Sequence, residues 1–106
     1  MRLLVVDDED LPRFALRDLL EREGHAADEA EHAPAAPEAV ARAQGAGAPY
    51  DLVLTDLRMP RVDGLTLLEL LRREAGAPLV VLLTAHGDER TAVQALRLGA
   101  YDYVPK

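Results

Sequence analysis

The stretch "VLTDLRMPRVDG" (53–64) joins an apolar run, an abrupt acid and a turn rich in proline and glycine. A short apolar run bounded by turn signals is typical of a buried β-strand. Asp56 stands at the end of that strand, where a charge costs free energy unless another group compensates it. The rest of the chain must therefore supply a partner for this carboxylate.

Strand and helix patterns alternate on both sides of this stretch. The predicted strands are 2–6, 25–30, 50–55, 79–84 and 101–104, and the predicted helices are 11–23, 34–44, 64–74 and 88–98. Such alternation favours a parallel sheet with helices on both faces. The first, third and fourth strands are apolar almost throughout, as interior strands are, whereas the second and fifth are more polar and suit sheet edges. The sequence thus predicts an α/β fold, a doubly wound five-stranded parallel sheet of order 2-1-3-4-5.

The first predicted helix, 11–23, has Asp10 as a suitable N-cap and Gly24 as a stop signal. Its apolar residues recur at helical spacing, which is typical of a helix that packs one face against a sheet. The residues that can share this face are Leu11, Phe14, Ala15, Leu19 and Leu20.

Length and composition limit the class of protein. A chain of 106 residues with 49% apolar residues is expected to form one domain, 1–106. It has no cysteine, so a disulfide framework and a thiolate metal site are excluded. The net charge of −7 argues against direct binding of nucleic acid. No apolar run approaches the ~20 residues of a membrane span, and the first residues do not resemble a signal peptide, so we expect a cytoplasmic protein.

Acids, a hydroxyl and an ammonium fall where the predicted strands end. In an open sheet of this order, ligands bind outside the carboxyl ends of the strands, near the switch between strands one and three. The groups that follow these strands are Asp7 and Asp8, Asp56, Thr84 and Lys106. Crowded carboxylates repel one another, a divalent cation relieves the repulsion, and oxygen-only ligands suit Mg²⁺. The set therefore predicts a Mg²⁺-dependent phosphoryl site in which one carboxylate can accept the phosphoryl group.

Each element of this site also has a simpler interpretation. The acids at 7–9 could stabilise a helix N-terminus through its dipole, and Asp56 could be a turn residue. Thr84 could be an ordinary strand end, and Lys106 could be solvated. The "DER" run at 88–90 is expected to be a solvated first turn of a helix. The coincidence of four such groups at the predicted strand ends favours the phosphoryl site.

The chain resembles a receiver domain of bacterial two-component response regulators. The matching motifs are "LLVVDDE" (3–9), "DLVLTDLRMPRVDG" (51–64), "VVLLTAHGD" (80–88) and "GAYDYVPK" (99–106), so the resemblance covers the whole chain. "DLRMP", "TAHGD" and "GAYDYVPK" are especially similar to receivers of enhancer-binding AAA+ transcriptional activators. The resemblance implies a flavodoxin-like, CheY-like fold and a signalling domain that is not a turnover enzyme, although it assists its own phosphorylation and dephosphorylation.

The resemblance also implies roles for single residues around the metal. Asp56 would be the phosphoacceptor, and Asp7 and Asp8 would hold Mg²⁺ together with the Asp56 carboxylate. Arg58 would give its main-chain carbonyl to the metal, which puts no demand on its side chain.

The remaining implied roles concern the phosphoryl group and the switch. Thr84 and Lys106 would bind the phosphoryl oxygens, and Tyr103 would be the aromatic switch residue. The partner would be a sensor histidine kinase that supplies the phosphoryl group from phosphohistidine. The 84–104 face would then change shape and control an effector domain or a downstream protein, with transcription as the expected output.

The sequence departs from the family at its end. Receivers usually continue past the lysine with a proline and a fifth helix, whereas this chain ends at Lys106. Either the residues beyond 106 are not represented or the domain is truncated. In a fold without the last helix, the sheet face that carries the helix 11–23 is partly bare and apolar, which predicts low stability or self-association, for example as a homodimer.

Three other functions remain open at this point. A Mg²⁺-dependent phosphohydrolase of the haloacid dehalogenase type would use Asp56 as its nucleophile, but it would carry an acid where Arg58 stands. A protein-interaction module that is never phosphorylated would use the 88–104 face. A flavodoxin-like nucleotide binder would need a phosphate-binding loop after the first strand, where "DDED" (7–10) repels phosphate.

Overall fold

The sheet is built from five short strands that all run in the same direction. The structure is a computed structural model that describes residues 1–57, 64–73, 76–85 and 87–105. The strands are β1 (Arg2–Val6), β2 (Ala26–Ala30), β3 (Leu52–Asp56), β4 (Leu79–Thr84) and β5 (Asp102–Pro105). They pair in the order β2-β1-β3-β4-β5, and every pairing is parallel. The predicted fold class and strand order are therefore confirmed.

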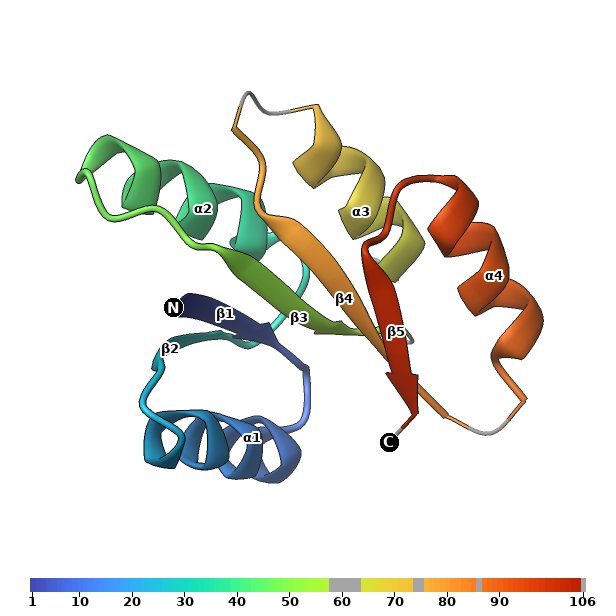
Figure 1. The fold of residues 1–106 in the computed structure, drawn as a ribbon, viewed down its shortest axis with the longest axis horizontal. Helices are drawn as coiled ribbons and strands as arrows, with labels where there is room; N and C mark the ends of the chain where they lie inside the picture. Colours follow the sequence, from blue (N-terminus) through green and yellow to red (C-terminus); the bar gives the residue numbers. More distant parts are fainter. Residues whose placement is uncertain (58–63, 74–75, 86, 106) are drawn as a thin grey trace.

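Four helices connect these strands within the described residues. They are α1 (Asp10–Arg22), α2 (Ala35–Gly45), α3 (Gly64–Arg72) and α4 (Glu89–Arg97). Figure 1 shows α2, α3 and α4 on one face of the sheet and α1 on the other. None of the described helices is long and apolar enough to cross a membrane.

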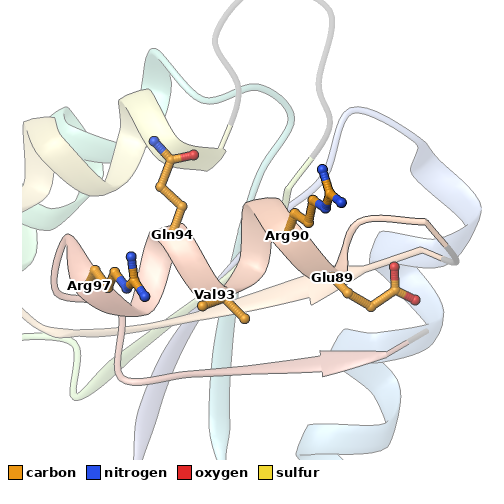
Figure 2. A pocket seen from close by; sticks show the side chains of 5 residues that line it. All are labelled: Glu89, Arg90, Val93, Gln94 and Arg97. Carbon is orange, nitrogen blue, oxygen red and sulfur yellow. The ribbon is translucent and has the colours of Figure 1, made fainter.

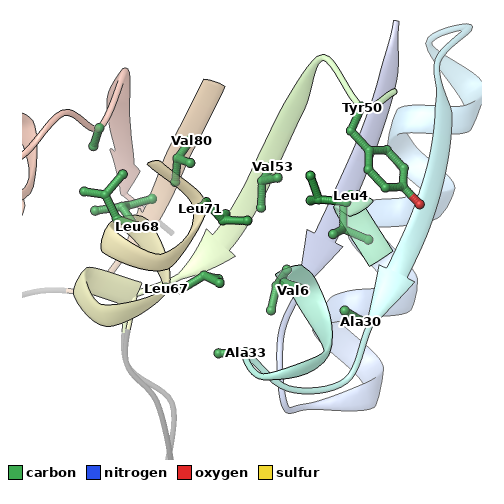
Figure 3. Close-up of a cluster of buried hydrophobic side chains, with 14 of the residues drawn as sticks. Leu4, Val6, Ala30, Ala33, Tyr50, Val53, Leu67, Leu68, Leu71 and Val80 are labelled. Atoms are coloured by element: carbon green, nitrogen blue, oxygen red, sulfur yellow. The ribbon is translucent and has the colours of Figure 1, made fainter. Parts of the chain in front are cut away.

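The main core lies between the sheet and the three helices α2, α3 and α4. Alternate residues of the strands point into it, because successive side chains of a strand face opposite sides of the sheet. Leu4 and Val6 of β1 and Val53 of β3 belong to one cluster with leucines of α3, and Figure 3 shows Val53 beside Leu71. The α3 leucines in this core are Leu67, Leu68 and Leu71, all fully buried. This packing holds the carboxyl ends of β1 and β3 side by side.

The helix α1 packs on the opposite face through a stripe that differs from the predicted one. Leu16 and Leu20 pack against Leu3, Leu54 and Val81 of the sheet. Of the predicted stripe, Leu20 packs on the sheet as expected, but the prediction is wrong for Leu11, Phe14, Ala15 and Leu19, which are exposed. The buried residue of α1 is Arg13, which lies three and seven positions before Leu16 and Leu20 and so shares their face.

The face that carries α1 is only partly covered in the described part of the chain. Val80 and Tyr103 point into the main core, so Leu79 and Val104, which precede and follow them, point to the α1 face. Leu79 is 49% exposed and Val104 is 45% exposed. In Figure 1, α1 lies against β1 and β2, and β4 and β5 have no described helix over the same face. Among the described residues, this part of the face therefore carries apolar side chains that are only partly covered.

Candidate functional site

Three carboxylates meet at the carboxyl edge of the sheet. Asp7 and Asp8 directly follow β1, and Asp56 is the last residue of β3. The two strands are neighbours with parallel register, so their ends lie together. One carboxylate oxygen from each of the three residues lies within 4.8 Å of the other two. The structure thus brings together three of the residues that the sequence singles out.

These carboxylates differ in their exposure to solvent. Asp7 is 3% exposed and Asp56 is 8% exposed, whereas Asp8 is open to solvent. Two buried carboxylates at close range repel one another strongly, because the surrounding protein screens charge less than water does. The site therefore favours binding of a cation.

The donor set fits Mg²⁺. This ion binds oxygen at about 2.0–2.1 Å in an octahedron, so ligands on opposite sides of one ion are about 4.2 Å apart. One carboxylate oxygen from each of Asp7, Asp8 and Asp56 lies within 4.8 Å of the other two, so the three side chains are grouped closely enough to share one ion. Mg²⁺ also keeps several of its waters, so a site with one solvent-exposed acid suits it.

The turn that carries Asp7 and Asp8 is fixed by hydrogen bonds around Asp7. The Asp7 main-chain N–H donates to the Ala30 carbonyl at 3.2 Å. The Oδ1 atom of Asp7 accepts a hydrogen bond from the Glu9 N–H at 3.0 Å. The Asp7 carbonyl accepts a hydrogen bond from Nη1 of Arg13 at 2.9 Å. The first acid of the site is therefore held at its amide, its carbonyl and its side chain.

Arg13 is a residue that the sequence analysis did not identify. It is 3% exposed, and besides the Asp7 carbonyl it contacts Oδ1 of Asp10 at 2.6 Å and Oε1 of Glu29 at 2.9 Å. Burial alone would lower the pKa of Arg13, but the hydrogen bonds with Asp10 and Glu29 outweigh burial and raise it. Asp10 is not the N-cap that the sequence predicts: Glu9 holds that position, and Asp10 begins the helix with its carboxylate on Arg13. The sequence does contain a signal for this residue: Arg13 lies at helical spacing from Leu16 and Leu20, and a charged residue on an apolar helix face indicates a buried ion pair.

Thr84 lies at the same edge, one strand beyond Asp56. It is the last residue of β4 and is buried. In the register of the sheet Asp56 pairs with Leu83, so Thr84 stands one position past Asp56 along the neighbouring strand. The hydroxyl is thus on the strand that adjoins the phosphoacceptor candidate.

The loop after Thr84 contains a buried acid that the sequence analysis placed in solvent. The expectation of a solvated turn at 88–90 holds for Glu89 and Arg90 but is wrong for Asp88, which is buried. Oδ2 of Asp88 accepts a hydrogen bond from the Ala85 N–H at 3.0 Å, and the Asp88 N–H donates to the Ala85 carbonyl at 3.2 Å. Asp88 therefore closes the loop that links Thr84 to α4.

Tyr103 lies on β5, opposite Leu82 of β4. It is half-buried and packs against the main core, on the face of the sheet that carries α4. The other two predicted site residues, Arg58 and Lys106, lie outside the residues that the structure describes. The described part of the predicted site is therefore Asp7, Asp8, Asp56, Thr84 and Tyr103.

A shallow hollow of about 570 Å³ lies on the outer side of α4. Figure 2 shows its five lining side chains, all from this helix: Glu89, Arg90, Val93, Gln94 and Arg97. None of them belongs to the acidic cluster. The hollow is thus a feature of the helix surface, within the 84–104 face, and is separate from the carboxylates.

Known proteins share both the sequence pattern and the fold. The family model for the response regulator receiver domain matches residues 3–106. The transcriptional regulatory protein ResD of Bacillus subtilis is 44% identical over 105 residues, which are 99% of this chain and 41% of that protein. The DNA-binding transcriptional regulator NtrC of Proteus hauseri is 39% identical over 102 residues, 96% of this chain and 20% of that protein. NtrC is an enhancer-binding activator, the class that the motifs indicated.

A solved structure agrees with the sequence relatives. The receiver domain of NtrX from Brucella abortus superimposes with a TM-score of 0.83 at 38% identity, over 98% of this chain and 84% of that chain. The chain spans less than half the length of ResD and NtrC. A family model that covers nearly every residue, relatives near 40% identity and the common fold lead to one conclusion: this chain belongs to the response regulator receiver domain family.

Proposed function

We propose that this receiver domain accepts a phosphoryl group on Asp56, with Mg²⁺ held by Asp7, Asp8 and Asp56, from a sensor histidine kinase. The observation that carries the proposal is the cluster of three carboxylates at the ends of β1 and β3, in which Asp56 is buried at the end of the central strand. A receiver is a signalling domain, so family membership favours this function over a phosphohydrolase.

The transfer step needs an oxygen of Asp56 as the nucleophile. This oxygen attacks the phosphorus of the phosphohistidine, an O–P bond forms, the N–P bond breaks, and the electron pair of the broken bond returns to the imidazole nitrogen. Mg²⁺, when bound, neutralises charge on the phosphoryl oxygens and reduces the repulsion between them and the carboxylate. Asp7 and Asp8 position the cation, and the Arg58 main-chain carbonyl completes the protein ligands in this proposal. Water attack on the phosphorus of the acyl phosphate reverses the modification.

Phosphorylation changes the charge at the end of β3 and thereby moves its neighbours. The phosphoryl group adds about −1.5 to −2 charges at Asp56. The Thr84 hydroxyl donates to a phosphoryl oxygen and Lys106 pairs with another, which draws the loop 84–88 toward the site. Tyr103 then packs into the space that Thr84 leaves. The new surface is the 84–104 face, which includes the outer side of α4.

The energies are of the right size for a switch. To move a two-state balance from 1:99 to 99:1, phosphorylation has to favour the active state by about 5.5 kcal/mol. Hydrogen bonds to charged groups contribute about 1.5–3 kcal/mol each, so two or three of them suffice. The bonds between Asp88 and Ala85 in the resting loop oppose part of this change.

The output of the switch follows from the relatives. ResD and NtrC are transcriptional regulators, so we infer an effector domain or a partner protein that controls transcription in the cytoplasm. The net charge of −7 argues against direct DNA binding by this domain, so we assign contact with DNA to the effector.

The experiment that tests the proposal is phosphorylation by acetyl phosphate with Mg²⁺, followed by intact-protein mass spectrometry. The wild-type chain should gain one phosphoryl group, and Asp56→Asn should gain none. Asp18→Asn, at an exposed acid of α1, is the matched control and should behave as wild type. Uptake by Asp56→Asn at the wild-type rate would show that another residue is the acceptor.

A further inference from the structure

Arg13 is a buried charge whose contacts converge on the acidic turn. A buried arginine costs free energy unless its donors find acceptors, and this guanidinium uses all three of its nitrogens. Nη1 donates to the Asp7 carbonyl, Nη2 to Asp10 and Nε to Glu29. It therefore links the end of β1, the first turn of α1 and the edge strand β2.

Arg13 contacts the main chain of Asp7 and not its carboxylate, so the contact affects the orientation of the backbone. The carbonyl that Arg13 binds belongs to the peptide between Asp7 and Asp8, so it sets the direction in which Asp8 leaves β1. The bond from the Glu9 N–H to Oδ1 of Asp7 sets the side chain of the first acid. Arg13 thus orients the peptide plane between two residues of the acidic cluster.

One partner of Arg13, Glu29, is also bound by a second arginine. Nη1 of Arg17 donates to Oε2 of Glu29 at 2.8 Å, and its Nε donates to Oε1 of Glu21 at 3.0 Å. Glu29 therefore receives one arginine on each oxygen. Arg17 carries the same charge as Arg13 and shares Glu29, and its hydrogen bonds go to Glu29 and Glu21. The two arginines form a natural pair for comparison.

A role limited to packing does not explain this arrangement. The position of Arg13 on α1 faces the sheet together with Leu16 and Leu20, where an apolar residue of similar volume is commonly as stable as a buried ion pair. The guanidinium instead places a fixed donor on the turn that presents the acids. Groups behind metal ligands typically change metal affinity by about 10–100-fold when they are removed.

We propose that Arg13 is a positioning residue that sets the Mg²⁺ affinity of the receiver by holding the Asp7–Asp8 peptide. This inference rests on the proposed function, because it concerns the same acidic cluster. Arg13 does not touch the phosphoryl group or the metal; it acts through the main chain of Asp7.

The test is a Mg²⁺ titration of the unphosphorylated chain, followed by NMR shifts of the amides of residues 7, 8 and 56. Arg13→Met keeps the length of the stem and removes the donors, and it should weaken Mg²⁺ binding about 10–100-fold. Arg17→Met is the matched control, with the same charge change and the same partner Glu29, and its Kd should stay within about twofold of wild type. Equal Kd values for Arg13→Met and wild type, or an equal loss in both variants, would overturn the proposal.

A conservative variant covers the case in which Arg13→Met does not fold. Arg13→Lys keeps the charge, but a single ammonium cannot reproduce a planar fork on three acceptors. It should weaken Mg²⁺ binding about tenfold while its spectrum keeps the dispersion of a folded protein. A folded Arg13→Lys with the wild-type Kd contradicts the proposal as firmly as Arg13→Met would.

A second measurement separates this inference from the proposed function. With acetyl phosphate, the Mg²⁺ concentration for half-maximal phosphorylation should rise in Arg13→Met, and the rate at saturating Mg²⁺ should return to near the wild-type value. If the wild-type chain takes up no phosphoryl group, the proposed function fails while the Mg²⁺ titration still decides the role of Arg13. If wild type is phosphorylated and the half-maximal Mg²⁺ concentration does not change, the positioning role fails alone.

Discussion

Asp7 and Asp56 hold carboxylate oxygens within 4.8 Å of each other across two neighbouring parallel strands. Both side chains are buried, and Asp8 adds a third acid from the solvent side. The fold therefore concentrates negative charge at one edge of the sheet, where neighbouring carboxylates repel one another. Because Mg²⁺ would bind the folded state at these carboxylates, the rise in melting temperature on addition of Mg²⁺ measures how tightly the ion binds.

The first prediction concerns Asp8→Asn. Removing this charge relieves repulsion, so the melting temperature without Mg²⁺ should rise, and removing a ligand should reduce the further rise that Mg²⁺ causes. At a Mg²⁺ concentration of 100 times Kd, wild type gains about 2.7 kcal/mol, which is about 10–20 °C for a domain of this size. Asp8→Asn should show less than half of that gain by calorimetry. Asp18→Asn is the control, and an undiminished gain in Asp8→Asn would remove Asp8 from the metal site.

The second prediction concerns the Thr84 hydroxyl. Thr84→Val removes the donor at nearly constant volume, so phosphorylation of Asp56 should continue while its effect on the loop 84–88 and on Tyr103 is lost. Thr84→Ser keeps the donor and should keep the effect. The measurement is the NMR shift change at Tyr103 on addition of beryllofluoride and Mg²⁺. A full shift change at Tyr103 in Thr84→Val would show that the hydroxyl does not couple the site to the switch.

The sequence predicts the fold and most of the site for a specific physical reason. Strands β1, β3 and β4 are apolar on both faces, so their place in the interior of the sheet and the meeting of Asp7 with Asp56 follow from the alternation of elements. Arg13 and Asp88 could not be identified in the same way. Arg13 is buried because tertiary packing brings it acceptors such as Glu29. Asp88 is buried in a loop in which its carboxylate accepts a hydrogen bond from the Ala85 N–H, and a run of charged residues does not reveal that loop geometry.

The same limit explains the error in α1. Hydrophobic spacing selected Leu11 and Phe14 for the sheet face, but the bonds of Arg13 to Asp7 and Glu29 turn another side of the helix inward. Leu16 and Leu20 then pack on the sheet, and Leu11 stays in solvent. An ion-pair network that spans two elements outweighs the apolar stripe and cannot be read from one helix alone.

The third prediction concerns the pH dependence of stability through Tyr50. Burial and the hydrogen bond from its hydroxyl to Oδ2 of Asp28, at 2.6 Å, raise the pKa of Tyr50 to about 12. The folded state thus keeps the proton that the unfolded state releases near pH 10. The contribution of Tyr50 is complete below pH 10 and is lost as pH rises from about 10 to about 12.

Tyr50→Phe should therefore destabilise the chain by about 0.5–1.5 kcal/mol at neutral pH, because the hydrogen bond to the solvent-exposed Asp28 carboxylate is lost. The difference from wild type in urea unfolding should shrink steadily above pH 10. Tyr101→Phe, at an exposed tyrosine, is the control and should show no such trend. A difference between Tyr50→Phe and wild type that stays constant up to pH 12 would contradict the assignment.

The last prediction concerns the sheet face that carries α1. Leu79 and Val104 are about half exposed on this face, beside the cluster of Leu3, Leu54 and Val81. Exposed apolar surface of this kind promotes association, so the chain 1–106 should self-associate with rising concentration in sedimentation velocity. The double variant Leu79→Lys with Val104→Lys should shift the population toward monomer. Val93→Lys makes a similar change at a residue of equal exposure on α4, and it should leave the association unchanged. A wild-type chain that stays monomeric at all concentrations, or a larger effect of Val93→Lys, would show that this face does not drive association.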